Sequence, residues 1–415
     1  MRVLSGRGAE AFVRKLEKRG SAELGKVEKT VRRIVDDVRK NGDHALRRYA
    51  EKWDDLTPRQ VFRVTETELQ QSWDGASTNF KDALKVAAAN IRQYSQWQKP
   101  VEWRKSACPG LELGQAVRPL HSVGCYVPGG RYPLPSTLLM TVIPAQVAGV
   151  PVIRVASPRP ARETLAAAFF LGVHEFYRVG GAQAIAALAY GTKSVPRVDK
   201  IVGPGNLFVT AAKKLVAFDC SIDFLAGPTE VVIVSDAGHP RFIAADLVAQ
   251  AEHDVDACAV FITGSQELAA SVAREIKALS LNNKTAKASL AKNGAILIAK
   301  SREQAFEFSN RISPEHITVD EDDSSMINNA GSIFVGDYSP QAAGDYSSGP
   351  NHVLPTGGAA RFRGGLNVTD FMKTISVQHL SRQGLLQIAP TVAALAKAEG
   401  LKAHAESIYV RCPSA

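Results

Sequence analysis

Apolar positions in the first quarter of the chain recur at helical spacing. Between Glu23 and Gln98 they return every three or four residues, with few glycine or proline interruptions. The clearest run consists of Val27, Val31, Ile34, Val35 and Val38. This spacing places the apolar side chains on one face of a helix. We therefore expect this segment to form a helical scaffold.

From His121 onward, short apolar runs alternate with helical stretches. The expected strands cover residues 123–127, 152–156, 175–179 and 200–202. The expected helices between and after them cover residues 137–148, 162–171, 182–190 and 207–218. This alternation predicts a mainly parallel sheet with helices on both faces.

A second alternating set predicts another lobe. Its strands are expected at residues 230–235, 257–263 and 295–298, and near Ile317 and Ile333. Its helices are expected at residues 241–252 and after Gln266. The glycine- and proline-rich stretch 337–367 separates this lobe from a helical tail. We therefore predict an α/β fold with two doubly wound, Rossmann-like lobes of mainly parallel sheets, N-terminal helices and a C-terminal helical tail.

Composition and charge narrow the class of protein. The 415 residues are 45% hydrophobic, enough for more than one core, and no apolar run is long enough to cross a bilayer. The N-terminus lacks an apolar signal core, so we expect a cytoplasmic protein without a membrane partner. The five cysteines are scattered and odd in number, which argues against a disulfide framework. The net charge of +9 lies largely on N-terminal segments where bases alternate with acids, so nucleic acid is not expected as a partner.

Three glycine-containing turns follow predicted strands, at residues 127–130, 179–183 and 202–206. Beyond the carboxyl ends of parallel strands, glycine lets the backbone approach a ligand, and the next helix offers free N–H groups. None of the turns is a full G-x-G-x-x-G motif, and each alone is more often a tight connection. Three of them in one lobe predict a shared nucleotide pocket.

Two pairs in the second lobe could carry chemistry. Gln250 and His253 are expected on one face of the helix that begins near Arg241, where they could bind a metal, although such a pair is usually ordinary packing. Glu315 and His316 follow Pro314, and a bend there would let both line one cleft. An imidazole suits proton abstraction from an alcohol, and a carboxylate can activate water. A solvated Glu–His turn is the alternative.

Two further pairs lie closer to the C-terminus. Asp345 and His352 are both suited to a divalent metal, and they occupy a loop whose length is typical of functional loops. Glu399 and His404 are five residues apart and would not share a helix face, so they could act together only at the end of the tail.

In order and spacing, these residues resemble the histidinol dehydrogenase family across nearly the whole chain, as far as His404. The most specific segments are residues 123–130, 179–188, 199–206, 250–253, 313–316 and 344–352. The resemblance implies an NAD-dependent zinc alcohol and aldehyde dehydrogenase. Its substrate would be L-histidinol, oxidised through L-histidinal to L-histidine in the last step of histidine biosynthesis.

The resemblance also implies a set of site residues. NAD would contact Tyr126, Gln183 and Asn206. One zinc ion per subunit would be held by Gln250, His253, Asp345 and His404. His404 would come from the tail of a partner subunit, so the protein would be a homodimer with shared active sites. Thr229, His316 and Glu399 would join the zinc ligands in contacting the substrate.

The implied chemistry suits these residue types. The amino and imidazole nitrogens of histidinol are donors that zinc accepts, so zinc would anchor the substrate. His316 would remove the hydroxyl proton while hydride passes to NAD. Glu315 would then activate water to hydrate the aldehyde, and a second NAD would accept the second hydride. The loop around Asp345 would close over the pocket.

Some residues depart from the family pattern, and other functions stay open. Thr229 stands where the family often has serine, and Val255 and Cys258 stand where it usually has proline and glutamine. The nearest alternative is a paralogous zinc dehydrogenase for another small polyol such as a sulfonated propanediol, which a basic residue such as Arg131 would favour. A basic nucleic-acid-binding protein and a zinc hydrolase are more distant alternatives.

These patterns and the resemblance predict four regions. Residues 1–25 are expected to form an N-terminal helical arm. Residues 26–120 with 231–365 would form a lobe that carries the zinc and the catalytic residues. Residues 121–230 would form the NAD lobe, and 366–415 a tail that reaches the partner subunit.

Overall fold

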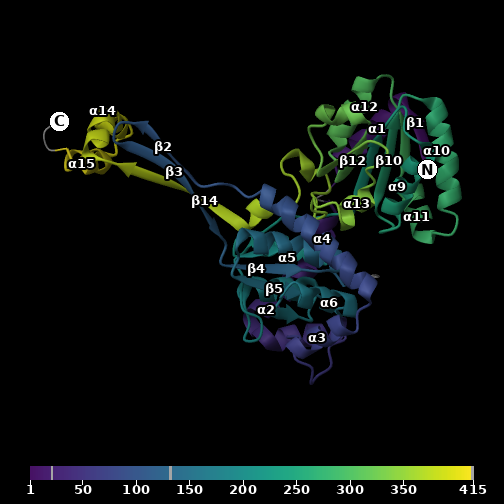
Figure 1. The fold of residues 1–415 in the computed structure, drawn as a ribbon, viewed down its shortest axis with the longest axis horizontal. Helices are drawn as coiled ribbons and strands as arrows, with labels where there is room; N and C mark the ends of the chain where they lie inside the picture. The colour runs from purple at the N-terminus through teal and green to yellow at the C-terminus, as the bar shows by residue number, and fades with distance from the viewer. Residues whose placement is uncertain (20–21, 130–132, 413–415) are drawn as a thin grey trace.

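The computed structural model describes residues 1–19, 22–129 and 133–412, and it contains two α/β lobes and a projecting arm (Figure 1). Gly130 of the first glycine turn and Arg131 lie outside the described residues. The expected α/β class with two mainly parallel, doubly wound lobes is confirmed. Within the described ranges, no helix is long and apolar enough to cross a membrane.

The five-stranded lobe contains a sheet in the order β6-β5-β4-β7-β8, with all neighbours parallel. Its strands are β4 (Ser122–Tyr126), β5 (Val152–Ala156), β6 (Glu175–Tyr177), β7 (Lys200–Val202) and β8 (Ser221–Ile222). Its crossover helices are α5 (Pro135–Ala148), α6 (Arg162–Phe170), α7 (Gly181–Tyr190) and α8 (Leu207–Val216). The strand order reverses between β4 and β7, which is where doubly wound sheets open a crevice for ligands.

The six-stranded lobe contains a parallel sheet in the order β1-β11-β10-β9-β12-β13. Its strands are β1 (Arg2–Ser5), β9 (Glu230–Val234), β10 (Cys258–Thr263), β11 (Ala295–Ile298), β12 (His316–Val319) and β13 (Ser332–Val335). Helices α1 (Gly6–Glu17) and α12 (Arg302–Ile312) pack on one face. Helices α9 (Pro240–Ala251), α10 (Gln266–Leu279) and α11 (Lys284–Lys292) pack on the other.

Short helical elements lie between or after the last strands of the six-stranded sheet. They are helix α13 (Gln341–Tyr346) and the 3-10 helices η1 (Glu321–Met326), η2 (Ala359–Arg361) and η3 (Val368–Phe371). Helix α13 packs against α9, so it belongs to the six-stranded lobe.

The packing of the N-terminal segments corrects the expected grouping. Residues 1–25 were predicted as a separate arm, yet β1 pairs with β11, and the apolar face of α1 is buried in the six-stranded lobe. Residues 26–120 were predicted to join that lobe, yet α2 (Ala22–Trp53), α3 (Glu66–Asp74) and α4 (Thr78–Trp97) pack on α5 to α8 of the five-stranded lobe. The stripe predicted around Val31 and Val38 forms one core with α7 and α8.

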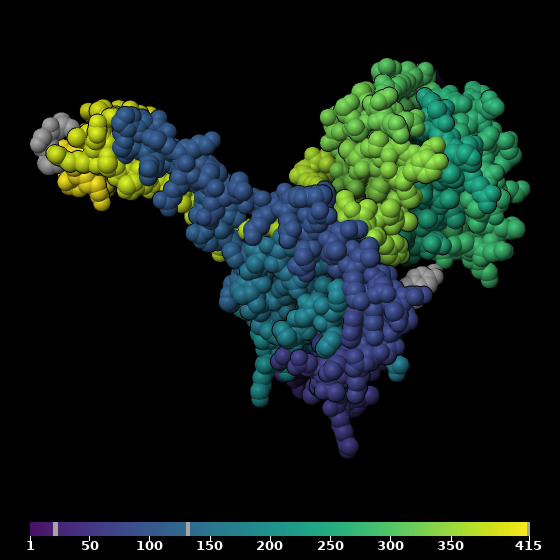
Figure 2. Space-filling model, in the orientation of Figure 1, coloured from purple at the N-terminus to yellow at the C-terminus, as the bar shows by residue number. Residues whose placement is uncertain are grey.

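The arm combines two distant parts of the chain. Strands β2 (Trp103–Cys108) and β3 (Leu111–Pro119) form an antiparallel sheet with β14 (Met372–Leu380), in the order β14-β3-β2. Helices α14 (Arg382–Ala398) and α15 (Lys402–Tyr409) follow at its tip. Figure 2 shows the arm extending away from both lobes.

Candidate functional site

Glu315 and His316 stand at the amino end of β12, beside the first residues of β9. Helix α12 ends at Ser313, whose left-handed φ of 51° reverses the chain before Pro314. Both side chains are buried, and Glu315 Oε2 lies 3.7 Å from His316 Nδ1. The bend predicted after Pro314 therefore brings both groups to one place.

Glu315 is held by donors from the start of β9. Thr229 Oγ1 donates to Glu315 Oε2 at 2.5 Å, and the Glu230 N–H donates to the same oxygen at 2.8 Å. The side-chain amide of Gln250 in turn donates to Thr229 Oγ1. Burial raises the pKa of Glu315 to about 7, although His316 and the two hydrogen bonds act in the opposite direction. Near neutral pH this carboxyl can therefore both release and take up a proton.

The imidazole of His316 has two distinct nitrogens. Nδ1 lies 3.2 Å from the Glu230 carbonyl oxygen, which can only accept, so Nδ1 carries the hydrogen. Nε2 is then the basic atom, and it lies 3.5 Å from Asp345 Oδ1. Burial alone would lower the pKa of His316, but the carboxylates of Glu315 and Asp345 raise it to about 9.

The predicted zinc ligands of the six-stranded lobe converge beside this pair. Gln250 lies on the last turn of α9, and Asp345 lies on α13, which packs against α9. His253 was expected on the same helix, but α9 ends at Ala251, and His253 follows in a turn. His253 still lies close enough to affect Asp345. Burial alone would raise the pKa of Asp345, but His316 and, less strongly, His253 lower it below its usual value.

These three residues offer an amide oxygen, an imidazole nitrogen and a carboxylate oxygen, which are donor types that zinc accepts. In the parts of the chain that the structure describes, no group of three His, Cys, Asp or Glu side chains could hold a metal ion. These three side chains therefore fit zinc if the side-chain oxygen of Gln250 is one of the ligands and a fourth ligand comes from outside this cluster.

Glu399 and His404 do not join the other site residues within one chain. Glu399 caps α14 and His404 lies on α15, both at the tip of the arm and exposed to solvent (Figure 1). In the described chain, His404 therefore does not lie with Gln250, His253 and Asp345.

The predicted NAD contacts gather at the carboxyl edge of the five-stranded sheet. Tyr126 ends β4, and its hydroxyl accepts from the Gly181 N–H at 3.1 Å. Gln183, on the first turn of α7, donates to Asp54 Oδ2 at 3.1 Å. Asn206 caps α8, and its side-chain oxygen accepts from two N–H groups of the first turn. The described parts of the three turns therefore lie along one edge of the sheet, and the shared nucleotide pocket expected there stays a prediction.

Gly203 shows why the third turn needs glycine. Its φ is +112°, a region that side chains rarely adopt, and an added Cβ would lie 2.1 Å from the Tyr126 carbonyl oxygen. The close approach of this turn to the end of β4 therefore depends on the missing side chain.

The two lobes meet beside the candidate site. His352 follows α13, and its Nε2 lies 3.2 Å from the hydroxyl of Thr137 on the first turn of α5. Its Nδ1 lies 2.7 Å from the Asp345 carbonyl oxygen. Both ring nitrogens of His352 thus have protein partners. The sequence suggested His352 as a possible metal ligand, but in the structure it connects the two lobes.

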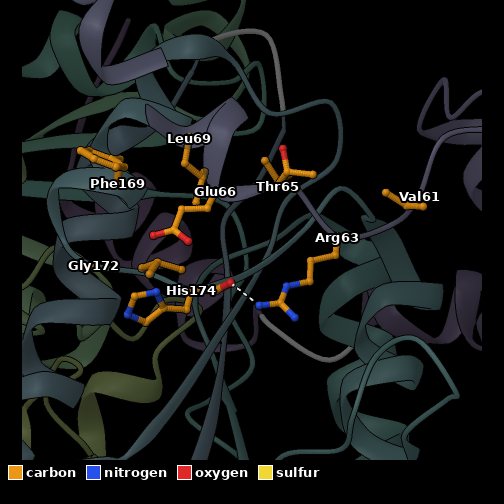
Figure 3. Close-up of a pocket in the computed structure, with 10 residues that line it drawn as sticks. Val61, Arg63, Thr65, Glu66, Leu69, Phe169, Gly172 and His174 are labelled. Atoms are coloured by element: carbon orange, nitrogen blue, oxygen red, sulfur yellow. Dashed lines mark hydrogen bonds between the residues drawn. The ribbon is translucent and has the colours of Figure 1, made fainter. Parts of the chain in front are cut away.

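One hollow is lined from both lobes, and another lies within the five-stranded lobe. A cleft of about 740 Å³ is lined from both lobes, with Leu207 and Thr210 on one side and Glu230 and Arg361 on the other. A groove of about 640 Å³ beside α3 and α6 is lined by Glu66, Phe169 and His174, among others (Figure 3). None of the predicted site residues lines this second groove.

Sequence reasoning missed two supporting carboxylates. Asp54 accepts from Gln183 and, at 3.0 Å, from the Gly180 N–H, so it fixes the second glycine turn. Glu230 forms a buried ion pair with Arg19, and its backbone holds both Glu315 and His316. Glu230 directly follows Thr229, which is a weak sequence signal, whereas nothing in the sequence around Asp54 indicates its role.

Comparisons with known proteins give a consistent result. The family model described as histidinol dehydrogenase matches residues 17–412. The histidinol dehydrogenases of Methanosarcina barkeri and Methanosarcina mazei are 48% and 46% identical to this chain, and each alignment covers 97% of the chain and 96% of the relative. The crystal structure of histidinol dehydrogenase from Elizabethkingia anophelis superposes with a TM-score of 0.94 at 32% identity, covering 100% of this chain and 98% of that one.

Proposed function

The chain belongs to the histidinol dehydrogenase family, and on this premise we propose that it oxidises L-histidinol through L-histidinal to L-histidine with NAD as hydride acceptor. The observation that carries the proposal is the buried Glu315–His316 pair at the junction with the NAD lobe. A general base and a carboxyl that titrates near neutral pH are the two groups that successive alcohol and aldehyde oxidation require.

We further propose a zinc site made by Gln250, His253, Asp345 and the His404 of a partner's arm. Bound zinc would anchor the amino and imidazole nitrogens of the substrate. Thr229, His316 and Glu399 would complete the substrate contacts, with Glu399 also supplied by the arm. The exposed position of Glu399 and His404 at the tip of the arm supports a homodimer with shared active sites.

In the first oxidation, His316 Nε2 would take the hydroxyl proton while NAD, when bound, would accept the hydride from the carbinol carbon. In the neutral ring the Glu230 carbonyl holds the Nδ1 hydrogen, so Nε2 is the nitrogen that would accept the proton. Tyr126, Gln183 and Asn206 would position the cofactor at the facing edge of the five-stranded lobe.

In the second oxidation, Glu315 would remove a proton from water as the water oxygen bonds to the aldehyde carbon. His316, again neutral, would take a hydroxyl proton from the resulting hydrate while its hydride passes to a second NAD, which leaves the product as the carboxylate. The hydroxyl of Thr229 and the N–H of Glu230 fix the carboxylate of Glu315 for this step. Serine or threonine can serve at position 229, because either hydroxyl makes this contact.

The stoichiometry of NADH tests the function directly. The zinc-loaded protein should form two NADH for each L-histidinol consumed, because one site carries out both oxidations. A chelator should abolish this turnover, and added zinc should restore it. A protein that binds zinc and NAD but does not oxidise histidinol would contradict the proposal.

We predict that Glu315→Gln separates the two steps. Oxidation of supplied L-histidinal should slow about 100-fold, because glutamine cannot accept a proton from water. The first NADH from L-histidinol should form at a rate within a few-fold of wild type. Single-turnover measurements with each substrate give the two rates.

Glu307→Gln is the matched control for this variant, because Glu307 lies exposed on α12, where it pairs with Arg311. Its two rates should both equal those of wild type. Equal slowing of both steps in Glu315→Gln would refute the division of roles.

A further inference from the structure

The segment that follows Asp345 is fastened to the opposite lobe. Asp345 itself lies on α13 in the six-stranded lobe, against α9. Directly afterwards, Asn90 on α4 donates its side-chain amide to the Ser347 carbonyl at 2.8 Å. Gly349 packs so closely on α4, at a φ of +117°, that a Cβ would lie 3.1 Å from the Asn90 carbonyl oxygen. A proposed zinc ligand thus sits where the chain passes from one lobe to the other.

Asn351 donates a hydrogen bond to a backbone carbonyl of α5 that has no N–H partner four residues further along the helix. The Met140 carbonyl would normally accept from the N–H of residue 144, but Pro144 has no N–H. The Asn351 Nδ2 group donates to this carbonyl at 2.6 Å. Pro144 therefore creates an acceptor inside a buried helix, and Asn351 satisfies it from the other side of the junction.

His352 connects the same helix to Asp345. The Asp345 carbonyl oxygen can only accept, so the Nδ1 of His352 donates to it at 2.7 Å. Nε2 then accepts from the Thr137 hydroxyl at 3.2 Å. Thr137 and Met140 are three residues apart, so both contacts fall on one face of α5. That helix follows β4, which ends at the proposed NAD contact Tyr126.

We propose that Asn351 and His352 are positioning residues that couple NAD binding on the five-stranded lobe to the placement of the Asp345 carboxylate. This inference rests on the proposed zinc and NAD sites. A shift of α5 on NAD binding passes through Thr137 and His352 to the backbone of Asp345. By linkage, NAD tightens zinc binding, and zinc tightens NAD binding by the same factor.

The coupling factor is measured on the full-length protein. The zinc dissociation constant is determined by competition with a chelator, with and without saturating NAD, and the ratio of the two values is the coupling factor. In wild type we expect a factor of at least about five, the lower end of typical allosteric coupling. In Thr137→Val, which cannot donate to His352, the factor should fall to about one.

Two variants separate coupling from a structural defect. Thr137→Ser keeps the hydroxyl and should keep the wild-type factor. Thr141→Val removes a buried hydroxyl one turn further along α5 that bonds within the helix rather than to His352, and it should also keep the factor.

Each outcome decides the matter. A factor of one in wild type, or an unchanged factor in Thr137→Val, overturns the coupling while leaving the proposed function in place. Loss of the factor in Thr141→Val as well would show a general defect of α5 and also overturns it. Failure of wild type to bind zinc or NAD would instead refute the proposed function, and the coupling with it.

Discussion

Replacing His316 with asparagine is expected to slow both oxidations about 1,000-fold, the middle of the range for loss of a general base. This corresponds to about 4 kcal/mol of lost transition-state stabilisation. Asparagine can still donate to the Glu230 carbonyl in place of Nδ1–H, so the surrounding backbone should keep its position. It offers no basic nitrogen at the position of Nε2, and neither hydride transfer has a proton acceptor. Steady-state kinetics with L-histidinol and with L-histidinal measure the two effects.

His239→Asn provides the control in the same lobe. His239 is exposed and caps α9, a role that asparagine also fills. This variant should retain wild-type rates. Rates for His316→Asn within ten-fold of wild type would show that another group accepts the proton.

Mixing two inactive variants is expected to restore activity. His404→Ala removes the proposed ligand on the arm and should reduce activity at least about 100-fold. His316→Asn leaves the arm intact but inactivates the site in its own lobe. In a mixed dimer, the arm of the second variant completes the intact lobe of the first. Random exchange of subunits should therefore recover about one quarter of wild-type activity, because half of the dimers gain one working site.

The control for the arm is His379→Ala, because His379 lies exposed on β14, where it pairs with Glu112. This variant should be fully active alone. If subunits exchange but the mixture stays inactive, each chain uses its own His404 or none, and the shared-site proposal fails.

The two sheets could be predicted because their strands are buried on both faces. Residues 231–234 and 258–262 are continuous apolar runs, and every residue of β9 and β10 is buried. The helices of residues 23–98 were also correctly predicted from their periodicity. Their partners were not, because an apolar stripe does not specify which sheet it covers. The packing of α2 on α7 and α8 is decided by contacts between segments far apart in the chain.

The strands of the arm could hardly be predicted from the sequence. Strand β2 is exposed at almost every position, and β14 alternates weakly, so neither has the apolar pattern of a strand that faces a core. The edge strand β1 is short and mostly exposed as well. Its pairing with β11 could not be predicted from four residues.

The candidate site was predicted as a set of residues but not as a geometry. Glu315, His316, Gln250 and Asp345 do lie together, whereas their catalytic and metal-binding roles stay predictions. Nothing in the spacing indicates that the cluster occupies the amino ends of β9 and β12, opposite to the edge where parallel sheets usually bind ligands. The bend at Ser313 explains this position, because it turns two polar side chains into the sheet before β12 begins.

The pairing of β3 with β14 also sets the order of events during synthesis. Met372 pairs with Pro119, so the hairpin of β2 and β3 is made long before the strand that completes its sheet. Contacts of such long sequence separation form late in folding. A nascent chain therefore has no finished arm until β14 has emerged from the ribosome, and in the proposed dimer no arm could reach a partner before then.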